Sequence, residues 1–181
     1  RLWPEPSRER MLMAMRQNLW APWRIDYLRG MNEAEPLPDF IAEAWAHPDR
    51  DPQNLVLYRD DFGLIMLNRF PYTNGHLLVA PGRAVADLKD LSRDERAALM
   101  DLVVLAEKVI DEALNPQGMN VGWNMGRCAG AALPGHLHAH LVPRWGGDVN
   151  FMETIGAVQI IPQALEAVYE EMLEALERVR S

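Results

Sequence analysis

The sequence is nearly free of cysteine, with only Cys128 among its 181 residues. A single thiol forms no internal disulfide and supplies no cysteine-rich zinc site. Chains that use neither kind of cross-link are typical of a reducing compartment. We therefore expect a cytoplasmic protein.

Long apolar runs and positive charge are also scarce. No run reaches 18 apolar residues, so no membrane span is expected, and residues 1–6 lack the apolar core of a signal peptide. The formal net charge is -8 at pH 7, whereas a nucleic-acid backbone calls for a basic surface. We expect neither a membrane nor a nucleic acid as partner. A small anion stays compatible, because local N–H groups and imidazoles outweigh a distant net charge.

The composition is otherwise that of an ordinary globular domain. Hydrophobic residues make up 49% of the chain and charged residues 24%, which is enough apolar material for a core. Residues 1–17 are polar and rich in arginine, so we expect a flexible N-terminal arm there. Residues 18–181 are then expected to form a single domain.

Apolar periodicity and turn residues predict an α+β fold with a largely antiparallel sheet of about five strands. Ser92 and Glu95 form a capping-box pattern that opens a long helix, and Pro162 opens a C-terminal helix. The stretch from 49 to 53 is interpreted as a loop. The expected elements are a short helix at 39–46, strands near 55–58, 64–67, 76–80, 119–125 and 137–143, and long helices at 92–114 and from 162 onward.

Three of the five histidines stand two residues apart, between His136 and His140. Side chains at alternate positions of a strand point the same way, so the three imidazoles are expected to share one face at intervals of roughly 7 Å. The alternate apolar residues, Leu137, Ala139 and Leu141, then face the core. A helix would instead turn positions i and i+2 to different sides.

Three interpretations of this histidine run (His136, His138 and His140) are open. The run can form an exposed polar strand edge, or it can hold zinc, which two histidines at i and i+2 are able to ligate. A zinc site would lack a cysteine pair and any acidic residue close in the sequence. The third interpretation is covalent catalysis. A neutral imidazole attacks phosphorus when its other nitrogen is held protonated, while its neighbours donate to the phosphoryl oxygens and the leaving group.

The segment His136–Val142 resembles the alternating histidine–hydrophobic signature of the histidine triad superfamily. Leu67–Pro81 is similar to the family's nucleoside-side strand and turn, and Asn120–Gly130 to its glycine-rich segment. Asn18–Arg24 and Pro143–Met152 resemble the diadenosine tetraphosphate phosphorylase-like branch. The resemblance implies the HIT fold, with the sheet extended across a homodimer or a higher homo-oligomer.

The resemblance also implies roles for individual residues. His138, the middle histidine, is the nucleophile that attacks the α-phosphorus and forms a nucleotidyl-histidine. His140 contacts the phosphate oxygens or the leaving group, and His136 holds the network and orients the nucleophile. Nucleotide and phosphate contacts are expected from Asn68, His76, Asn124, Gly126, Ala131, Ala132 and Trp145.

Two departures from the family pattern bear on the chemistry. The phosphorylase-like branch commonly has glycine and a small polar residue where this chain has Ala131-Ala132, which leaves open how the second phosphate or an attacking water is held. Many relatives bind a structural zinc through a cysteine pair near Phe40-Ile41 and a later histidine, and here the cysteines are absent and Ala84 replaces the histidine. We expect no metal site and no required cofactor, although a divalent metal can accompany a polyphosphate substrate.

The expected function is that of a nucleotidyltransferase or phosphorylase of dinucleoside polyphosphates. The adenylyl group of diadenosine tetraphosphate passes to His138, with ATP as the first product. Inorganic phosphate then accepts it, with ADP as the second product. One alternative is an enzyme that uses water as acceptor, acting as a hydrolase or nucleotide phosphoramidase. The other is a nucleotide sensor without turnover, against which the intact run of histidines argues.

Overall fold

The computed structural model describes residues 38–148 and 161–181. The expected N-terminal arm at 1–17, the segment 18–24 and the end of the phosphorylase-like stretch at 149–152 lie outside these residues. The described residues all belong to the unit Pro36–Ser181.

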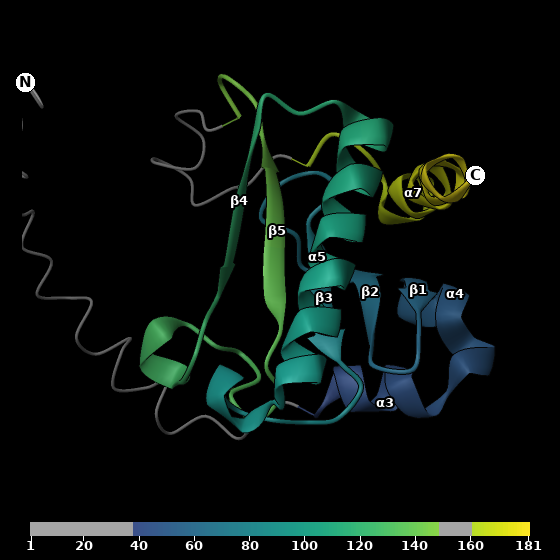
Figure 1. The fold of residues 1–181 in the computed structure, drawn as a ribbon. Coiled ribbons are helices and arrows are strands. Elements are labelled where there is room, and N and C mark those ends of the chain that lie inside the picture. Colours follow the sequence, from purple (N-terminus) through teal and green to yellow (C-terminus); the bar gives the residue numbers. More distant parts are fainter. Residues whose placement is uncertain (1–37, 149–160) are drawn as a thin grey trace, which may run out of the picture. The chain divides into compact units, whose positions relative to one another are not determined.

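One antiparallel sheet of five strands forms the centre of this unit, in the order β1-β2-β3-β5-β4 (Figure 1). The strands are β1 (Val56–Arg59), β2 (Gly63–Leu67), β3 (Leu77–Pro81), β4 (Gly118–Trp123) and β5 (Ala139–Arg144). β1 and β2 form a hairpin closed by Asp60, whose carboxylate accepts the N–H groups of Phe62 and Gly63 at 2.8 and 2.9 Å. The α+β class and the antiparallel sheet expected from the sequence are confirmed.

Four α-helices accompany the sheet in the described residues: α3 (Phe40–Ala46), α4 (Asp51–Asn54), α5 (Arg93–Leu114) and α7 (Leu165–Arg180). The expected capping box opens α5, because the Ser92 hydroxyl accepts the Glu95 N–H at 3.1 Å and the Glu95 carboxylate accepts the Ser92 N–H at 2.7 Å. None of these helices is both long enough and apolar enough to cross a membrane.

The prediction of a loop at 49–53 is wrong. The chain there forms a 3-10 turn at Pro48–Arg50 and then α4. Pro48 and Pro52 each occupy the first turn of a helix, where a missing N–H costs nothing because first-turn amides have no helical partner. The two prolines thus lie in the first turns of two short helices.

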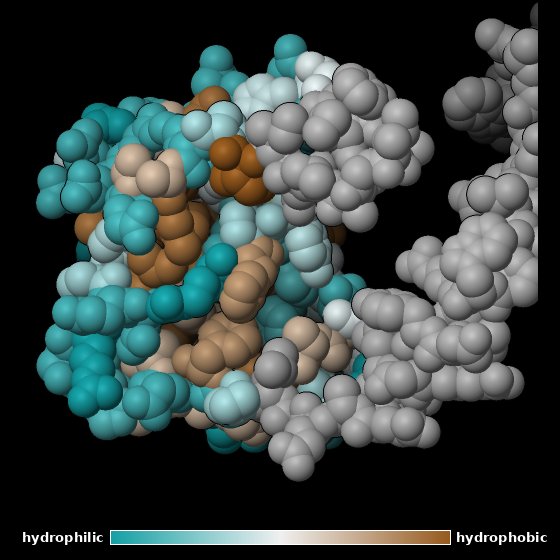
Figure 2. Space-filling view, turned by 180° about the vertical axis from the view of Figure 1, so that it is seen from behind, coloured by the Kyte–Doolittle hydropathy of each residue, from teal (hydrophilic) through white to brown (hydrophobic). Residues whose placement is uncertain are grey.

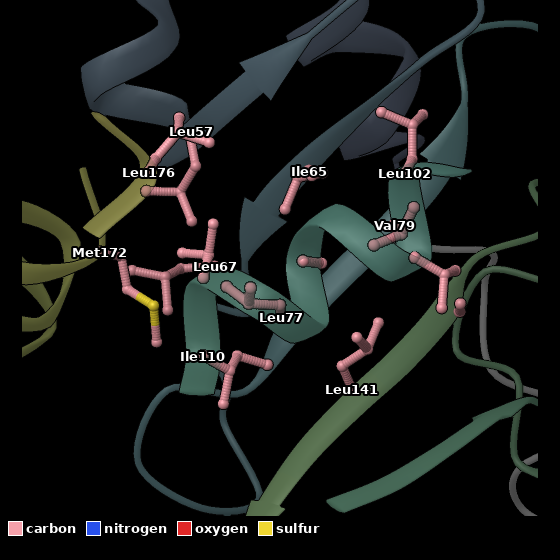
Figure 3. Close-up of a cluster of buried hydrophobic side chains, with 14 of the residues drawn as sticks. Leu57, Ile65, Leu67, Leu77, Val79, Leu102, Ile110, Leu141, Met172 and Leu176 are labelled. Carbon is pink, nitrogen blue, oxygen red and sulfur yellow. The ribbon is translucent and has the colours of Figure 1, made fainter. Parts of the chain in front are cut away.

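α5 and α7 cover one face of the sheet, and the main hydrophobic core lies between them and the strands (Figures 1 and 3). Core members labelled in Figure 3 are Leu57, Ile65, Leu67, Leu77, Val79 and Leu141 from the strands, Leu102 and Ile110 from α5, and Met172 and Leu176 from α7. Leu137, Ala139 and Leu141 belong to this core and are at most 2% exposed. The prediction that these alternate residues face the core is confirmed.

The opposite face of the sheet has a smaller core under α3. Ile41 and Ala44 of α3 pack there against Val56, Leu64, Met66, Leu78, Ala80 and Leu133. Because β2 and β3 are buried on both faces, their sequences are apolar throughout and do not alternate. The same packing brings Asp39, at the start of α3, into contact with His136.

Candidate active site

The histidine run lies where β3 and β5 pair, on the face of the sheet opposite α5. β5 begins at Ala139 and not near 137 as expected, because the Leu137 N–H leaves the ladder and donates to the carbonyl of Val85 at 2.6 Å. The rings of His138 and His140 still come together, with their centroids 4.9 Å apart. The alternation along the chain thus brings His138 and His140 together, but the three imidazoles do not follow one regular strand as expected, because only His140 lies in the ladder.

His138 has the protonation state of a nucleophile. Its Nδ1 lies 2.8 Å from the backbone oxygen of His136, and because a carbonyl only accepts, Nδ1 donates the proton. The lone pair is then on Nε2. Burial lowers the pKa of His138, and the bond to the His136 carbonyl opposes that shift. The ring is mainly neutral at pH 7, which is the form that attacks phosphorus.

A chain of hydrogen bonds sets the proton of His140. The Tyr72 N–H donates to Nδ1 of His76 at 3.1 Å, and the Asn68 amide nitrogen lies 3.2 Å from the same atom. His76 must therefore carry its proton on Nε2, which lies 3.0 Å from Nδ1 of His140. His140 accepts at Nδ1 and keeps its own proton on Nε2. Nε2 lies 3.5 Å from the side-chain amide nitrogen of Asn124, and because both nitrogens then donate, this contact leaves the His140 N–H for another acceptor.

Burial keeps both of these rings neutral. It lowers the pKa of His76 to about 3, with smaller effects from His140 and His138. It lowers the pKa of His140 to about 4, with a smaller effect from His138. At neutral pH the site thus presents one lone pair, on His138, and one N–H donor, on His140, without a positive charge on either ring.

His136 is fully buried and is bound at both ring nitrogens. Its Nδ1 lies 3.1 and 3.0 Å from the two carboxylate oxygens of Asp39, and its Nε2 lies 2.8 Å from the carbonyl oxygen of Pro81. Asp39 was not among the residues expected at the site, and it stands 97 positions before His136 in the sequence. Its one signal was its place at the start of an expected helix, where it accepts the Ala42 N–H at 2.9 Å.

A largely apolar cavity of about 390 Å³ opens beside His138 and His140. Its other walls include Phe40, Met66, Asn68, Phe70, Leu78 and Ala132. Figure 2 shows this side of the molecule, the one turned away from α5, where apolar side chains gather within a hydrophilic surround. An apolar cavity with a few polar groups at one end is the usual form of a small-molecule site.

A second cavity, of about 400 Å³, extends from His140 along β4 and β5. Tyr72 and His140 line both cavities. Asn124 and Arg144 line the second, but the Arg144 guanidinium is bound by the carboxylate of Asp148 at 2.5 and 2.9 Å. Its charge is therefore largely compensated, and the cavity offers mainly neutral donors.

Two of the expected ligand contacts have other partners in the structure. Asn68 lines the first cavity, but its side chain also holds the turn, since its oxygen accepts the Phe70 N–H at 2.9 Å and its nitrogen faces His76. A ribose hydroxyl would meet the second lone pair or the second N–H of this amide. His76 is fully buried and its ring contacts His140, so the structure does not place it as a direct ligand contact.

The remaining expected contacts differ in exposure. Ala132 lines the first cavity together with His138, whereas the neighbouring Ala131 is only 5% exposed. Gly126 has a φ of 82°, which an L side chain rarely adopts, and it begins the 3-10 turn before Gly130. Trp145 is half-buried and lies outside the linings of both cavities. Across residues 38–148 and 161–181, no cluster of three or more metal-ligating side chains is found.

Several known proteins are similar to this chain in sequence or in fold. The HIT domain family model matches residues 50–147. A Mycobacterium tuberculosis protein named AP-4-A phosphorylase is 42% identical over 156 residues, which cover 82% of this chain and 78% of the relative. An asymmetrical bis(5'-nucleosyl)-tetraphosphatase of Schizosaccharomyces pombe is 37% identical over 95 residues, which cover 52% of each protein. A solved histidine triad protein of Sulfolobus tokodaii matches with a TM-score of 0.62 and 24% identity, covering 76% of this chain and 93% of that one.

Proposed function

The chain belongs to the HIT domain family, and from that membership we propose that it is an enzyme that transfers nucleotidyl groups through His138. One observation carries the proposal. His138 has a free lone pair on Nε2, and the N–H donor of His140 lies beside it in a ring 4.9 Å away between centroids. A nucleophile next to a donor for the leaving group is what displacement at phosphorus requires.

The proposed substrates are diadenosine tetraphosphate and inorganic phosphate. His138 Nε2 attacks the α-phosphorus, an N–P bond forms, and the P–O bond to the departing ATP breaks while His140 donates a hydrogen bond to its oxygen. The Nδ1 proton stays on His138 and is held by the His136 carbonyl. A phosphate oxygen then attacks the same phosphorus, the N–P bond breaks, and ADP leaves with His138 neutral again.

The apolar cavity suits the adenosine of the transferred group. Phe40 and Phe70 line it and are 39% and 81% exposed, and aromatic rings at a cavity wall are suited to stacking on a base. The polar end of the cavity, at His138 and His140, is where the α-phosphate would lie. In this proposal a divalent metal, where one is used, comes with the polyphosphate, and the chain has no resident cofactor.

Phosphate is favoured as acceptor because the relative named AP-4-A phosphorylase aligns with most of this chain. Water is the alternative acceptor, because relatives that include a tetraphosphatase share the family. Ala132 bears on this choice, since it lines the cavity without offering a hydrogen bond to either acceptor. A nucleotide sensor is the second alternative, and the nucleophile geometry of His138 argues against it.

The test is incubation with diadenosine tetraphosphate, with and without phosphate, followed by product analysis. ADP and ATP that form only with phosphate support phosphorolysis, whereas AMP and ATP without phosphate support hydrolysis. Tight nucleotide binding without any product would support the alternative of a nucleotide sensor. His138→Asn serves as the control variant, because it should bind nucleotide but lose turnover and the adenylylated intermediate in intact-protein mass spectra.

We propose further that two copies of the chain associate through β4. This strand lies at the edge of the sheet and pairs only with β5 within the described residues. Val121 of β4 is 48% exposed, and an exposed apolar side chain on an open edge strand marks an interface. We place the enzyme in the cytoplasm, where the exposed free thiol of Cys128 would stay reduced.

A further inference from the structure

Both ring nitrogens of His136 face hydrogen-bond acceptors. Nε2 lies 2.8 Å from the carbonyl oxygen of Pro81, which accepts and never donates. Nδ1 lies 3.0 Å from a carboxylate oxygen of Asp39. A neutral imidazole has only one N–H, so one of these two contacts needs a second proton, shared between His136 and Asp39.

Three observations assign that second proton to the imidazole. An ordinary imidazole is a stronger base than an ordinary carboxylate. The Asp39 side chain is one-third exposed and accepts the Ala42 N–H at 2.9 Å, and both water and that bond favour the ionised carboxylate. The His136 ring is fully buried, and a buried cation persists where it is paired and fully hydrogen-bonded, as here.

We propose that Asp39 is a positioning residue for the nucleophile, which it orients by clamping His136 as an imidazolium between the start of α3 and the end of β3. The clamp fixes residue 136, and the backbone oxygen of that residue accepts the Nδ1 proton of His138 at 2.8 Å. Asp39 thereby keeps the lone pair of His138 on Nε2. The kinetic part of this inference rests on the proposed function.

The charges of the clamp also affect the pKa of His138. The His136 charge lowers the pKa of His138 and the Asp39 charge raises it. The pair together is neutral, so it orients the nucleophile without adding a net charge that would reduce its basicity.

Two substitutions separate the parts of the clamp. Serine and asparagine both cap helices about as well as aspartate, so α3 keeps its N-cap in either variant. Asp39→Asn keeps a hydrogen bond to His136, with its amide N–H donating to Nδ1, but removes the charge. A serine side chain is too short to reach the His136 ring, so Asp39→Ser removes both the hydrogen bond and the charge. Asp49→Ser, at a side chain 76% exposed, is the matched control.

The direct measurement is the two-bond proton–nitrogen spectrum of the histidine rings at pH 8, where a free imidazole is neutral. In the wild-type chain both nitrogens of His136 should be protonated, and in Asp39→Asn only Nε2. In Asp39→Ser, His138 should change from a single Nδ1–H tautomer to a mixture. A singly protonated His136 in the wild type, or an unchanged His138 in Asp39→Ser, would overturn the inference.

Kinetics supply the second test. A misplaced nucleophile lowers the rate constant of adenylylation by about 10²-fold, so Asp39→Ser should lose kcat with little change in KM, and Asp39→Asn should lie between it and the wild type. Wild-type kcat in Asp39→Ser would refute the positioning role and leave the proposed function standing. A wild-type chain that shows the expected spectrum but converts no dinucleoside polyphosphate would instead refute the proposed function alone.

Discussion

The Nε2 atom of His76 lies 3.0 Å from the Nδ1 atom of His140, and this contact decides which nitrogen of His140 bears its proton. The Tyr72 N–H occupies the other nitrogen of His76, so the two rings can be protonated in only one arrangement. The N–H of His140 is left on the side of the cavities. A histidine with no exposed surface thus determines which ring nitrogen of His140 is the donor at the candidate site.

Replacing His76 should therefore affect both stability and chemistry. His76→Leu leaves the Tyr72 N–H and the His140 nitrogen without partners, and an unsatisfied buried group costs about 1–3 kcal/mol. His76→Gln retains one acceptor and one donor and should recover much of the stability and of the adenylylation rate. Urea unfolding gives the stability, and single-turnover adenylylation gives the rate. Equal rates in the leucine and glutamine variants would show that His76 only fills space.

Stability should fall in mild acid. The pKa values of His76 and His140 in the folded chain, about 3 and about 4, lie below the ordinary 6.5, and that of His138 is also lowered. As the pH falls below 6.5, these histidines therefore bind protons in the unfolded chain while they stay neutral in the folded chain. The stabilisation is present above the unfolded pKa of 6.5 and is lost progressively as the pH falls, down to about 4 for His140 and about 3 for His76.

Urea midpoints at pH 7 and pH 5 measure this effect while the carboxylates stay largely ionised. The proton taken up at His76 contributes up to about 1.4 kcal/mol per pH unit within the window. His76→Leu should show a smaller difference between the two midpoints than the wild type. Identical midpoints for the wild-type chain at both pH values would contradict the neutral, buried state of these rings.

Ala132 offers a test of the acceptor step. Ala132→Ser adds a hydroxyl to the wall that His138 shares, and a hydrogen bond to a charged group is worth about 1.5–3 kcal/mol. The KM for phosphate should fall by roughly tenfold or more in the second half-reaction, with the adenylylation rate little changed. Ala97→Ser, on the exposed side of α5, is the control. A change in adenylylation alone would place residue 132 on the nucleoside side instead.

Local signals in the sequence were sufficient for much of the fold and for the histidines. The Ser92–Glu95 box predicts the start of α5, because both of its hydrogen bonds are made within four residues. The spacing of the histidine run predicts that Leu137 and Leu141 are buried and that the imidazoles gather. These features depend on periodicity along one segment, which a single sequence displays directly.

Features that depend on contacts between distant segments could not be predicted in this way. Asp39 meets His136 only because α3 packs on the far face of the sheet, 97 positions away in the sequence. The late start of β5 likewise follows from the bond between Leu137 and Val85, a residue in the loop after β3. The burial that makes His76 neutral also depends on tertiary packing, so its role appears only in the fold.

The edge strand β4 supplies the remaining prediction, which concerns assembly. Val121→Lys places a charge at the centre of the proposed interface, and burying an unpaired charge costs several kcal/mol, so the dissociation constant should rise by at least about 10²-fold. Phe62→Lys is the matched control, because Phe62 is 49% exposed against 48% for Val121 but lies in the turn between β1 and β2.

Sedimentation across a range of concentrations measures the dissociation constants of the wild-type chain and of both variants. A wild-type chain that is monomeric at every concentration refutes the dimer. Dissociation caused by Phe62→Lys and not by Val121→Lys would move the interface to the β1 edge, because a charge disrupts association only where the partner excludes water.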